Sequence, residues 1–93
     1  MALEFRWDPR KAASNLRKHG VSFEDAATAF GDPHSITIPD PDHSAAEHRF
    51  TLIGMTRRGL VVVVSHTERG DTIRIINARK ATRSERAFYE EDS

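Results

Sequence analysis

The chain has 93 residues, with fourteen Lys or Arg, fourteen Asp or Glu and no cysteine. So short a chain has apolar material for one core only, and without cysteine it has neither a disulfide framework nor a thiolate metal site. Its net charge of zero is unevenly distributed: residues 21–48 carry six acidic residues and no Lys or Arg, whereas residues 49–86 carry nine Lys or Arg and three acidic residues. We expect a single domain over residues 1–93 whose C-terminal half can bind a polyanion locally, although a solvated face of mixed charge has the same composition.

The first third of the chain predicts a strand and two helices. "LEFRW" at residues 3–7 alternates apolar and polar side chains, which is typical of a short strand. Asp8 suits a helix N-cap and Gly20 a left-handed C-cap, so the residues between them predict a helix of about ten residues. In "SFEDAATAFGDP", Ser22 can cap a second helix. Four apolar residues recur there at helical spacing: Phe23, Ala26, Ala27 and Phe30.

After Pro33 the sequence predicts strands joined mostly by tight turns. "HSITIP", "RFTLIGM", "LVVVVSH" and "TIRIINAR" have strand composition, and "TRRG" and "TERGD" are turn sequences, while "DPDHSAAEH" is a polar loop. Short connections make sequential strands antiparallel neighbours. Thr82 and Glu85 have capping-box spacing ahead of a short helix, in which we expect Tyr89 to pack on the sheet.

Together these elements predict an α+β fold. Two N-terminal helices and a short C-terminal helix are expected to pack on one face of an antiparallel sheet of three to four strands. The charged N-terminal stretch is unlike the apolar core of a signal peptide, and no later apolar run approaches the length of a membrane span. We therefore expect a cytoplasmic protein with no membrane partner.

The predicted hairpin "SHTERGDTIRIINARKAT", at residues 65–82, carries more ionisable groups than a soluble turn needs. We expect a two-residue turn at Arg69 and Gly70. One face of the hairpin then carries His66, Glu68, Asn77 and Arg79. Arg74 points to the other face in this register, although a bulge would change that, because a one-residue slip moves every following side chain across the sheet.

These groups suit the metal-independent cleavage of RNA. A base removes the proton from a ribose 2′-hydroxyl, and the oxygen attacks the adjacent phosphate. Cations stabilise the developing charge while an acid protonates the departing 5′-oxygen. Glu or His suits the base, Arg the cation and His the acid, and DNA would not react because it lacks the 2′-hydroxyl. No spacing in the chain is by itself specific for this chemistry, since a solvated hairpin edge has the same composition.

The sequence resembles the BrnT family of bacterial toxins, which belongs to the wider RelE-like ribonuclease fold. The similarity extends through "FRWDPRKAASNLRKHGVSFEDAATAF", "DPDHSAAEHRFTLIGMT" and "VVVVSHTERGDTIRIINARKATRSERAFYE". The resemblance implies a type II toxin, an endoribonuclease that cleaves RNA and arrests translation. It also implies a BrnA-like antitoxin with a ribbon-helix-helix domain. That antitoxin would join two toxin copies in a dimer of heterodimers and bring the complex to operator DNA.

The family assignment supports a specific set of site residues. The predicted catalytic residues are His66 and Glu68 for proton transfer and Arg74 and Arg79 for the phosphate. The predicted RNA-binding residues are Arg69, Lys80, Lys11, Lys18 and His19. The last three could equally form the solvated face of a helix. RelE-like toxins vary in their catalytic groups, so the sequence leaves open which of His66 and Glu68 is the base.

Two other functions fit the same residues. The chain could be a toxin-like module that only binds an antitoxin and controls its operon, or a non-catalytic RNA-binding domain. The joint presence of the four predicted catalytic residues favours the enzyme, because antitoxin binding alone does not require them. No cofactor is expected. No metal site is expected either, since three histidines with acidic neighbours lack compact ligand spacing: His34, His43 and His48. Trp7 could stack on a base, although it ends an alternating strand and is expected to lie partly in the core.

Overall fold

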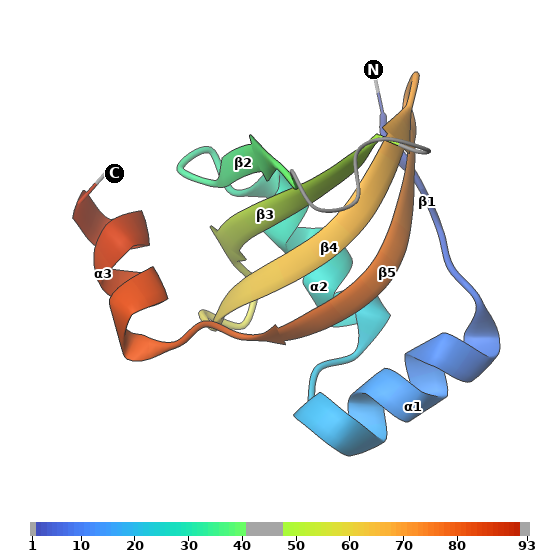
Figure 1. Ribbon diagram of the computed structural model, residues 1–93, viewed down its shortest axis with the longest axis horizontal. Helices are drawn as coiled ribbons and strands as arrows, with labels where there is room; N and C mark the ends of the chain where they lie inside the picture. The colour runs from blue at the N-terminus through green and yellow to red at the C-terminus, as the bar shows by residue number, and fades with distance from the viewer. Residues whose placement is uncertain (1, 41–47, 92–93) are drawn as a thin grey trace.

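A computed structural model describes residues 2–40 and 48–91 as three α-helices, a short 3₁₀-helix and a five-stranded sheet (Figure 1). The elements in chain order are β1 (Glu4–Arg6), α1 (Pro9–His19), α2 (Phe23–Thr28), η1 (Ala29–Gly31), β2 (Ile36–Pro39), β3 (Arg49–Met55), β4 (Val61–Arg69), β5 (Thr72–Lys80) and α3 (Arg83–Glu91). The α+β class is as predicted.

Both N-terminal helices begin where the sequence predicts and α1 also ends there, whereas α2 ends at Thr28 and Phe30 lies in the 3₁₀-helix that follows. The Asp8 side chain accepts a hydrogen bond from the backbone N–H two residues on (2.8 Å), and Gly20 ends α1 with a φ of 72°. The Ser22 hydroxyl accepts a bond from the N–H three residues on (3.0 Å) and so caps α2.

A buried amide fixes α1 to the sheet. The Asn15 side chain donates through Nδ2 to the carbonyls of Ala78 (2.8 Å) and Val21 (3.0 Å), and its Oδ1 accepts from the Ala78 N–H (3.1 Å). Asn15 is 6% exposed, so these bonds satisfy a polar group that would otherwise be costly to bury. They set the distance between α1 and the last strand.

The sheet has the strand order β1-β5-β4-β3-β2. Strands β2 to β5 are antiparallel neighbours, as their short turns predict, but β1 pairs with β5 in parallel. The prediction of three to four antiparallel strands is therefore wrong in number and in direction. A parallel pair needs a long crossover connection, and here residues 7–71 separate the two strands. Local turn signals carry no information about such a pairing.

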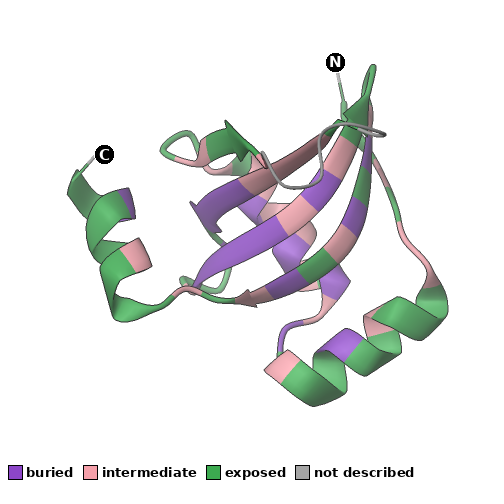
Figure 2. Cartoon of the chain, viewed as in Figure 1, coloured by how far each residue is buried: buried purple, intermediate pink, exposed green. Residues whose placement is uncertain are grey.

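Different helices cover the two faces of the sheet. On one face, Val62 and Val64 of β4 belong to a core with Phe23 of α2. On the other, Val63 clusters with Tyr89 of α3, and we call this side the α3 face. Figure 2 shows the buried residues along the middle strands and exposed ones at the β4–β5 turn. The prediction that all helices share one face is wrong, because the "VVVV" run of β4 is apolar on both sides.

The β4–β5 hairpin turns at Gly70 and Asp71, not at Arg69 and Gly70. Arg69 lies opposite Thr72, and Gly70 has a φ of 59°, which suits the first central position of a type II′ turn. The turn therefore lies one position later than predicted, and each cross-strand partner near it lies two residues further along β5, which leaves the faces of the side chains there unchanged.

A β-bulge further changes the register of β5. His66 lies opposite Ile75 and Ser65 lies opposite Asn77, so Ile76 is the extra residue. Side chains on either side of Ile76 consequently fall out of simple alternation. This shift decides which charged residues of the hairpin share a face.

Candidate functional site

Arginines line the α3 face at the end nearest the β4–β5 turn. Val61 and Val63 of β4 cluster with Tyr89 on this face, and side chains alternate along a strand. Thr67 and Arg69 therefore also point to the α3 face. Thr67 lies opposite Arg74 on one side and Arg49 on the other, and Arg74 lies opposite Arg6. We call Arg6, Arg49, Arg69 and Arg74 the arginine end. Because α3 follows the far end of β5, this part of the face lies away from the helix (Figure 1).

The bulge brings Arg74 and Arg79 to the same face. The two residues are five apart, so a regular strand would direct them to opposite sides of the sheet. With Ile76 as an extra residue, Arg74 lies opposite Thr67 and Arg79 opposite Val63, and both partners point to the α3 face. The predicted separation of Arg74 from Arg79 is therefore wrong.

His66 and Glu68 point to the opposite face. His66 is 0% exposed, and its ring lies edge-on to Phe30 (4.8 Å between centroids) and stacks with Phe50 (5.9 Å). Its Nε2 donates to Glu68 Oε2 (2.9 Å), because a carboxylate oxygen only accepts. The Glu68 side chain is 39% exposed beside the turn. The predicted common face with Arg79 is wrong, and His66 has no surface with which to contact a substrate.

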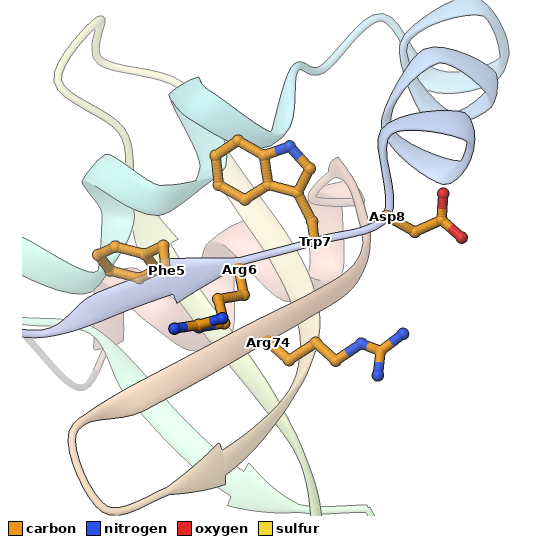
Figure 3. Close-up of a pocket in the computed structure, with 5 residues that line it drawn as sticks. All are labelled: Phe5, Arg6, Trp7, Asp8 and Arg74. Carbon is orange, nitrogen blue, oxygen red and sulfur yellow. The ribbon is translucent and has the colours of Figure 1, made fainter.

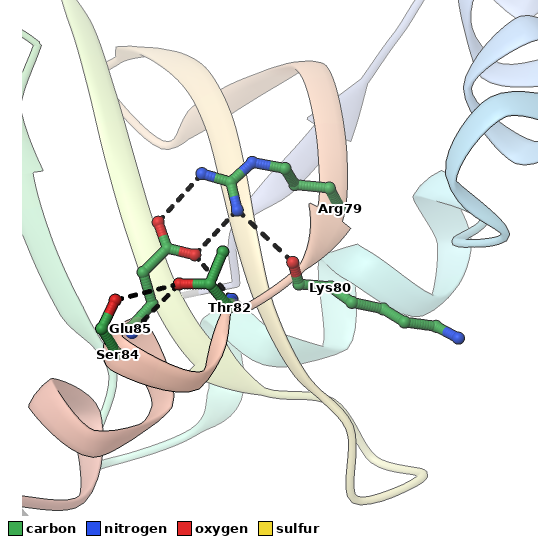
Figure 4. Close-up of polar contacts among 5 residues, drawn as sticks. All are labelled: Arg79, Lys80, Thr82, Ser84 and Glu85. Atoms are coloured by element: carbon green, nitrogen blue, oxygen red, sulfur yellow. Dashed lines mark hydrogen bonds and ion pairs between the residues drawn. The ribbon is translucent and has the colours of Figure 1, made fainter.

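Arg79 is held by α3 at the other end of the α3 face (Figure 4). Its Nη1 donates to Glu85 Oε1 (2.7 Å) and its Nη2 to Oε2 (2.9 Å). Glu85 also accepts from the Thr82 N–H (2.8 Å), and Thr82 Oγ1 accepts from the Glu85 N–H (3.2 Å), which confirms the capping box. The Arg79 hydrogen bonds lower the pKa of Glu85 to about 2, although burial opposes them. Those bonds in turn raise the pKa of Arg79.

A second polar contact fixes α3 to the sheet. Tyr89 is 5% exposed and its hydroxyl donates to Asp32 Oδ2, which also accepts from the Met55 N–H. Burial and the bond to Asp32 raise the pKa of Tyr89 to about 12. Burial tends to raise the pKa of Asp32, but the hydrogen bonds that it accepts outweigh burial and lower it. We call the Arg79–Glu85 and Tyr89–Asp32 contacts the α3 latch.

The other predicted RNA-binding residues fall at three places. A groove of about 230 Å³ between α1 and β5 is lined by Lys11, Ser14, Asn15, Lys18, His19, Ile76 and Asn77. The structure thus brings the three predicted residues of α1 to one groove beside β5. Arg69 belongs to the arginine end. Lys80 lies opposite Val62, so it points away from the α3 face.

Three residues of the α3 face were not among the predicted site residues: Arg6, Arg49 and Glu85. The alternation in "LEFRW" does put Arg6 on the side opposite Phe5 and Trp7, which was a usable signal. Nothing in the sequence indicated that this strand pairs in parallel with β5. Trp7 lies partly in the core, with its ring 6.0 Å from that of Phe23, as its place at the end of an alternating strand predicts.

In residues 2–40 and 48–91, no group of three or more His, Cys, Asp or Glu is placed to hold a metal ion. His43 and its neighbours Asp42 and Glu47 lie outside the described residues. No helix in the described part of the chain is long and apolar enough to cross a membrane.

Comparisons with known proteins agree with this architecture. The sequence model of a family described as "Ribonuclease toxin, BrnT, of type II toxin-antitoxin system" matches residues 7–85. Among solved structures, the fold is similar to the ribonuclease toxin BrnT of Brucella abortus, with a TM-score of 0.68 and 22% sequence identity. The match covers 88% of this chain and 100% of that chain. A search of curated proteins finds no significant match. The wider RelE-like relationship stays a prediction.

Proposed function

The chain belongs to the BrnT family of ribonuclease toxins of type II toxin-antitoxin systems, and from this premise we propose that it is a metal-independent endoribonuclease. In this proposal the RNA strand lies across the arginine end of the α3 face. Cleavage of cellular RNA there would arrest translation.

The observation that carries the proposal is the exposed guanidinium of Arg74 at the arginine end, which has no carboxylate partner among the described residues. Between the arginines the α3 face carries short polar side chains that can approach a sugar-phosphate backbone: Thr51, Ser65, Thr67, Thr72 and Asn77. Such a surface suits a phosphate chain, because guanidinium groups form paired, charge-assisted hydrogen bonds with phosphate oxygens.

In the proposed reaction, the ribose 2′-oxygen loses its proton to a base and attacks the adjacent phosphorus. The bond to the 5′-oxygen breaks, which leaves a 2′,3′-cyclic phosphate and, after proton transfer, a 5′-hydroxyl. Arg74 stabilises the charge on the phosphate oxygens in the transition state. No metal ion takes part in this scheme.

We assign the predicted proton-transfer residues different parts. Glu68 lies exposed beside the turn and is the one that can meet a substrate, whereas buried His66 orients Glu68 through the bond from Nε2. The two residues lie across the sheet from Arg74, so the substrate must reach Glu68 around the turn. Arg79 takes no part in this scheme, because its charge is already compensated by the two hydrogen bonds to Glu85.

We further propose that a BrnA-like antitoxin neutralises the toxin by covering the arginine end. Through its ribbon-helix-helix domain the antitoxin would also bring the complex to operator DNA. In this arrangement a saturating amount of antitoxin abolishes RNA cleavage. Undiminished cleavage would place the antitoxin elsewhere on the molecule.

One observation favours a second candidate, a non-catalytic module that binds only the antitoxin. Of the four predicted catalytic residues, His66 is buried, Glu68 is bonded to it and Arg79 is paired with Glu85. Only Arg74 is uncommitted in the described structure. The two candidates differ in whether the purified protein cuts RNA.

The deciding experiment incubates the purified protein with an RNA strand and with the matching DNA strand, in the presence of EDTA. The proposed activity cuts the RNA, leaves 2′,3′-cyclic phosphate ends and spares the DNA. Arg74→Ala provides the matched inactive variant, confirmed as folded by its thermal unfolding. Intact RNA, combined with tight binding of the antitoxin, would support the non-catalytic module.

A further inference from the structure

Arg6 and Arg74 lie side by side at the outer edge of the arginine end. They are direct partners in the parallel pairing of β1 and β5. Like charges placed opposite each other on adjacent strands repel and destabilise the pairing. The pairing of these two arginines therefore adds no stability to the free protein. This points to an anionic ligand that compensates their positive charge.

A pocket opens at this pair of arginines. Its volume is about 600 Å³, and it is lined by Phe5, Arg6, Trp7, Asp8 and Arg74. Figure 3 shows the side chains of Arg6 and Arg74 on one side of β1, with their guanidinium groups directed away from each other, and the rings of Phe5 and Trp7 on the other side. The open side of β1 is thus basic, while its apolar side chains are turned to the core.

The carboxylates near the pocket leave N–H donors of the two arginines unused. Glu4 Oε1 accepts from Nε (2.9 Å) and Nη2 (2.7 Å) of Arg6, but the two side chains are 59% and 69% exposed. Exposed pairs of this kind contribute little, and a guanidinium has five N–H donors, so Arg6 keeps donors for a second anion. The Asp8 carboxylate accepts from the Arg10 N–H as the cap of α1.

We propose that Arg6 and Arg74 together bind one backbone phosphate of the RNA strand, with the attached nucleotide in the pocket beside β1. Arg6 is then a substrate-binding residue that nothing in the sequence assigned. The inference rests on the proposed ribonuclease function and adds a phosphate subsite to it. A phosphate between the two guanidiniums removes their repulsion and forms charge-assisted hydrogen bonds with both. Such a contact positions the strand without selecting its sequence.

The test compares Arg6→Gln with Arg58→Gln, which removes the same charge from an 85% exposed side chain in the β3–β4 turn. Binding is measured by fluorescence anisotropy with a 2′-O-methyl RNA strand, which cannot be cut by 2′-oxygen attack, over a series of salt concentrations. We expect Arg6→Gln to weaken binding about tenfold and to reduce the steepness of the logarithmic salt dependence by about 0.7, as for one lost phosphate contact on a single strand. Arg58→Gln should leave both quantities at the wild-type values.

Thermal unfolding separates substrate binding from a structural role. Because Arg6→Gln relieves repulsion with Arg74, its Tm should equal or exceed that of the wild type. A lower Tm together with weaker binding would make Arg6 a structural residue and overturn the inference. Wild-type affinity and salt dependence in Arg6→Gln would overturn it while leaving the ribonuclease function intact. A wild-type protein that neither binds nor cuts RNA would overturn the proposed function itself.

Discussion

The two ends of the α3 face use their arginines differently. At the end covered by α3, Arg79 has a carboxylate partner in the chain itself, Glu85, whose pKa falls to about 2 as a result. At the arginine end, Arg74 faces a second arginine, Arg6, and no carboxylate pairs with it among the described residues. Both ends belong to one sheet face and are built from the same strand, β5.

This difference separates structural from functional charge. Arg79 is held by Glu85 against α3 and so contributes to the fold, whereas Arg74 is exposed, has no carboxylate partner among the described residues and can bind an external anion. Arg79 therefore belongs with the packing of α3, although its position in "NARK" suggested the same role as Arg74. Changes at the two ends should consequently have opposite effects on stability and on RNA cleavage.

The largest expected effect is at the arginine end. Arg74→Ala should lower the rate of RNA cleavage by about 100-fold or more, as loss of a transition-state donor does. Its free energy of unfolding should change by less than about 0.5 kcal/mol, because the side chain is exposed. Rates of cleavage and urea unfolding of the same preparation check both. A clear loss of stability would place Arg74 with the structural arginines.

His66 is buried on the other face of the sheet and tests whether a predicted catalytic residue can be purely structural. His66→Ala should lower the free energy of unfolding by about 2–4 kcal/mol, because it leaves a cavity between Phe30 and Phe50. Glu68→Ala is the matched variant. It should lower the free energy of unfolding by about 1 kcal/mol or less and should abolish RNA cleavage, because proton transfer is lost. Equal losses of stability in the two variants, measured by urea unfolding, would contradict the assignment of Glu68 to the substrate and His66 to its support.

The α3 latch should behave as a purely structural feature. Tyr89→Phe should lower the free energy of unfolding by about 1–2 kcal/mol, since it removes a hydrogen bond to a carboxylate, and should leave RNA cleavage unchanged. Tyr89 is the only tyrosine of the chain, so its ultraviolet absorbance can be titrated directly. We expect a midpoint near pH 12 in the wild type. A midpoint near 10 would show that the hydroxyl is neither buried nor bonded to Asp32.

The Arg79–Glu85 pair should make the stability of the fold depend on pH. The folded-state pKa of Glu85, about 2, lies below its unfolded value of 4.5. The Arg79–Glu85 pair therefore stabilises the fold fully above about pH 4.5, and this contribution is lost as the pH falls towards 2. Glu85→Gln should cost roughly 1–2 kcal/mol at pH 7, after allowance for solvent screening, and progressively less below pH 4.5. A constant difference from the wild type between pH 7 and pH 3 would argue against the ion pair.

The sequence by itself determined the elements whose signals are local. Asp8, Ser22 and Gly20 mark helix ends through hydrogen bonds or backbone conformations that involve residues at most four positions away. The Thr82–Glu85 capping box is of the same kind. The long ordered similarities in the first and last blocks of the chain were enough to identify the family. Each of these signals is complete within a short stretch of chain.

Only the tertiary structure decided which charged residues share a face. One extra residue, Ile76, brings Arg74 and Arg79 to the same side and leaves His66 and Glu68 on the other side. The parallel pairing of β1 with β5 then places Arg6 beside Arg74. Strand side chains alternate with a period of two, so a single bulge or slip reverses a face, and pairings between distant segments are fixed by packing of the whole chain. No local sequence pattern indicated the bulge at Ile76 or the parallel pairing of β1 with β5.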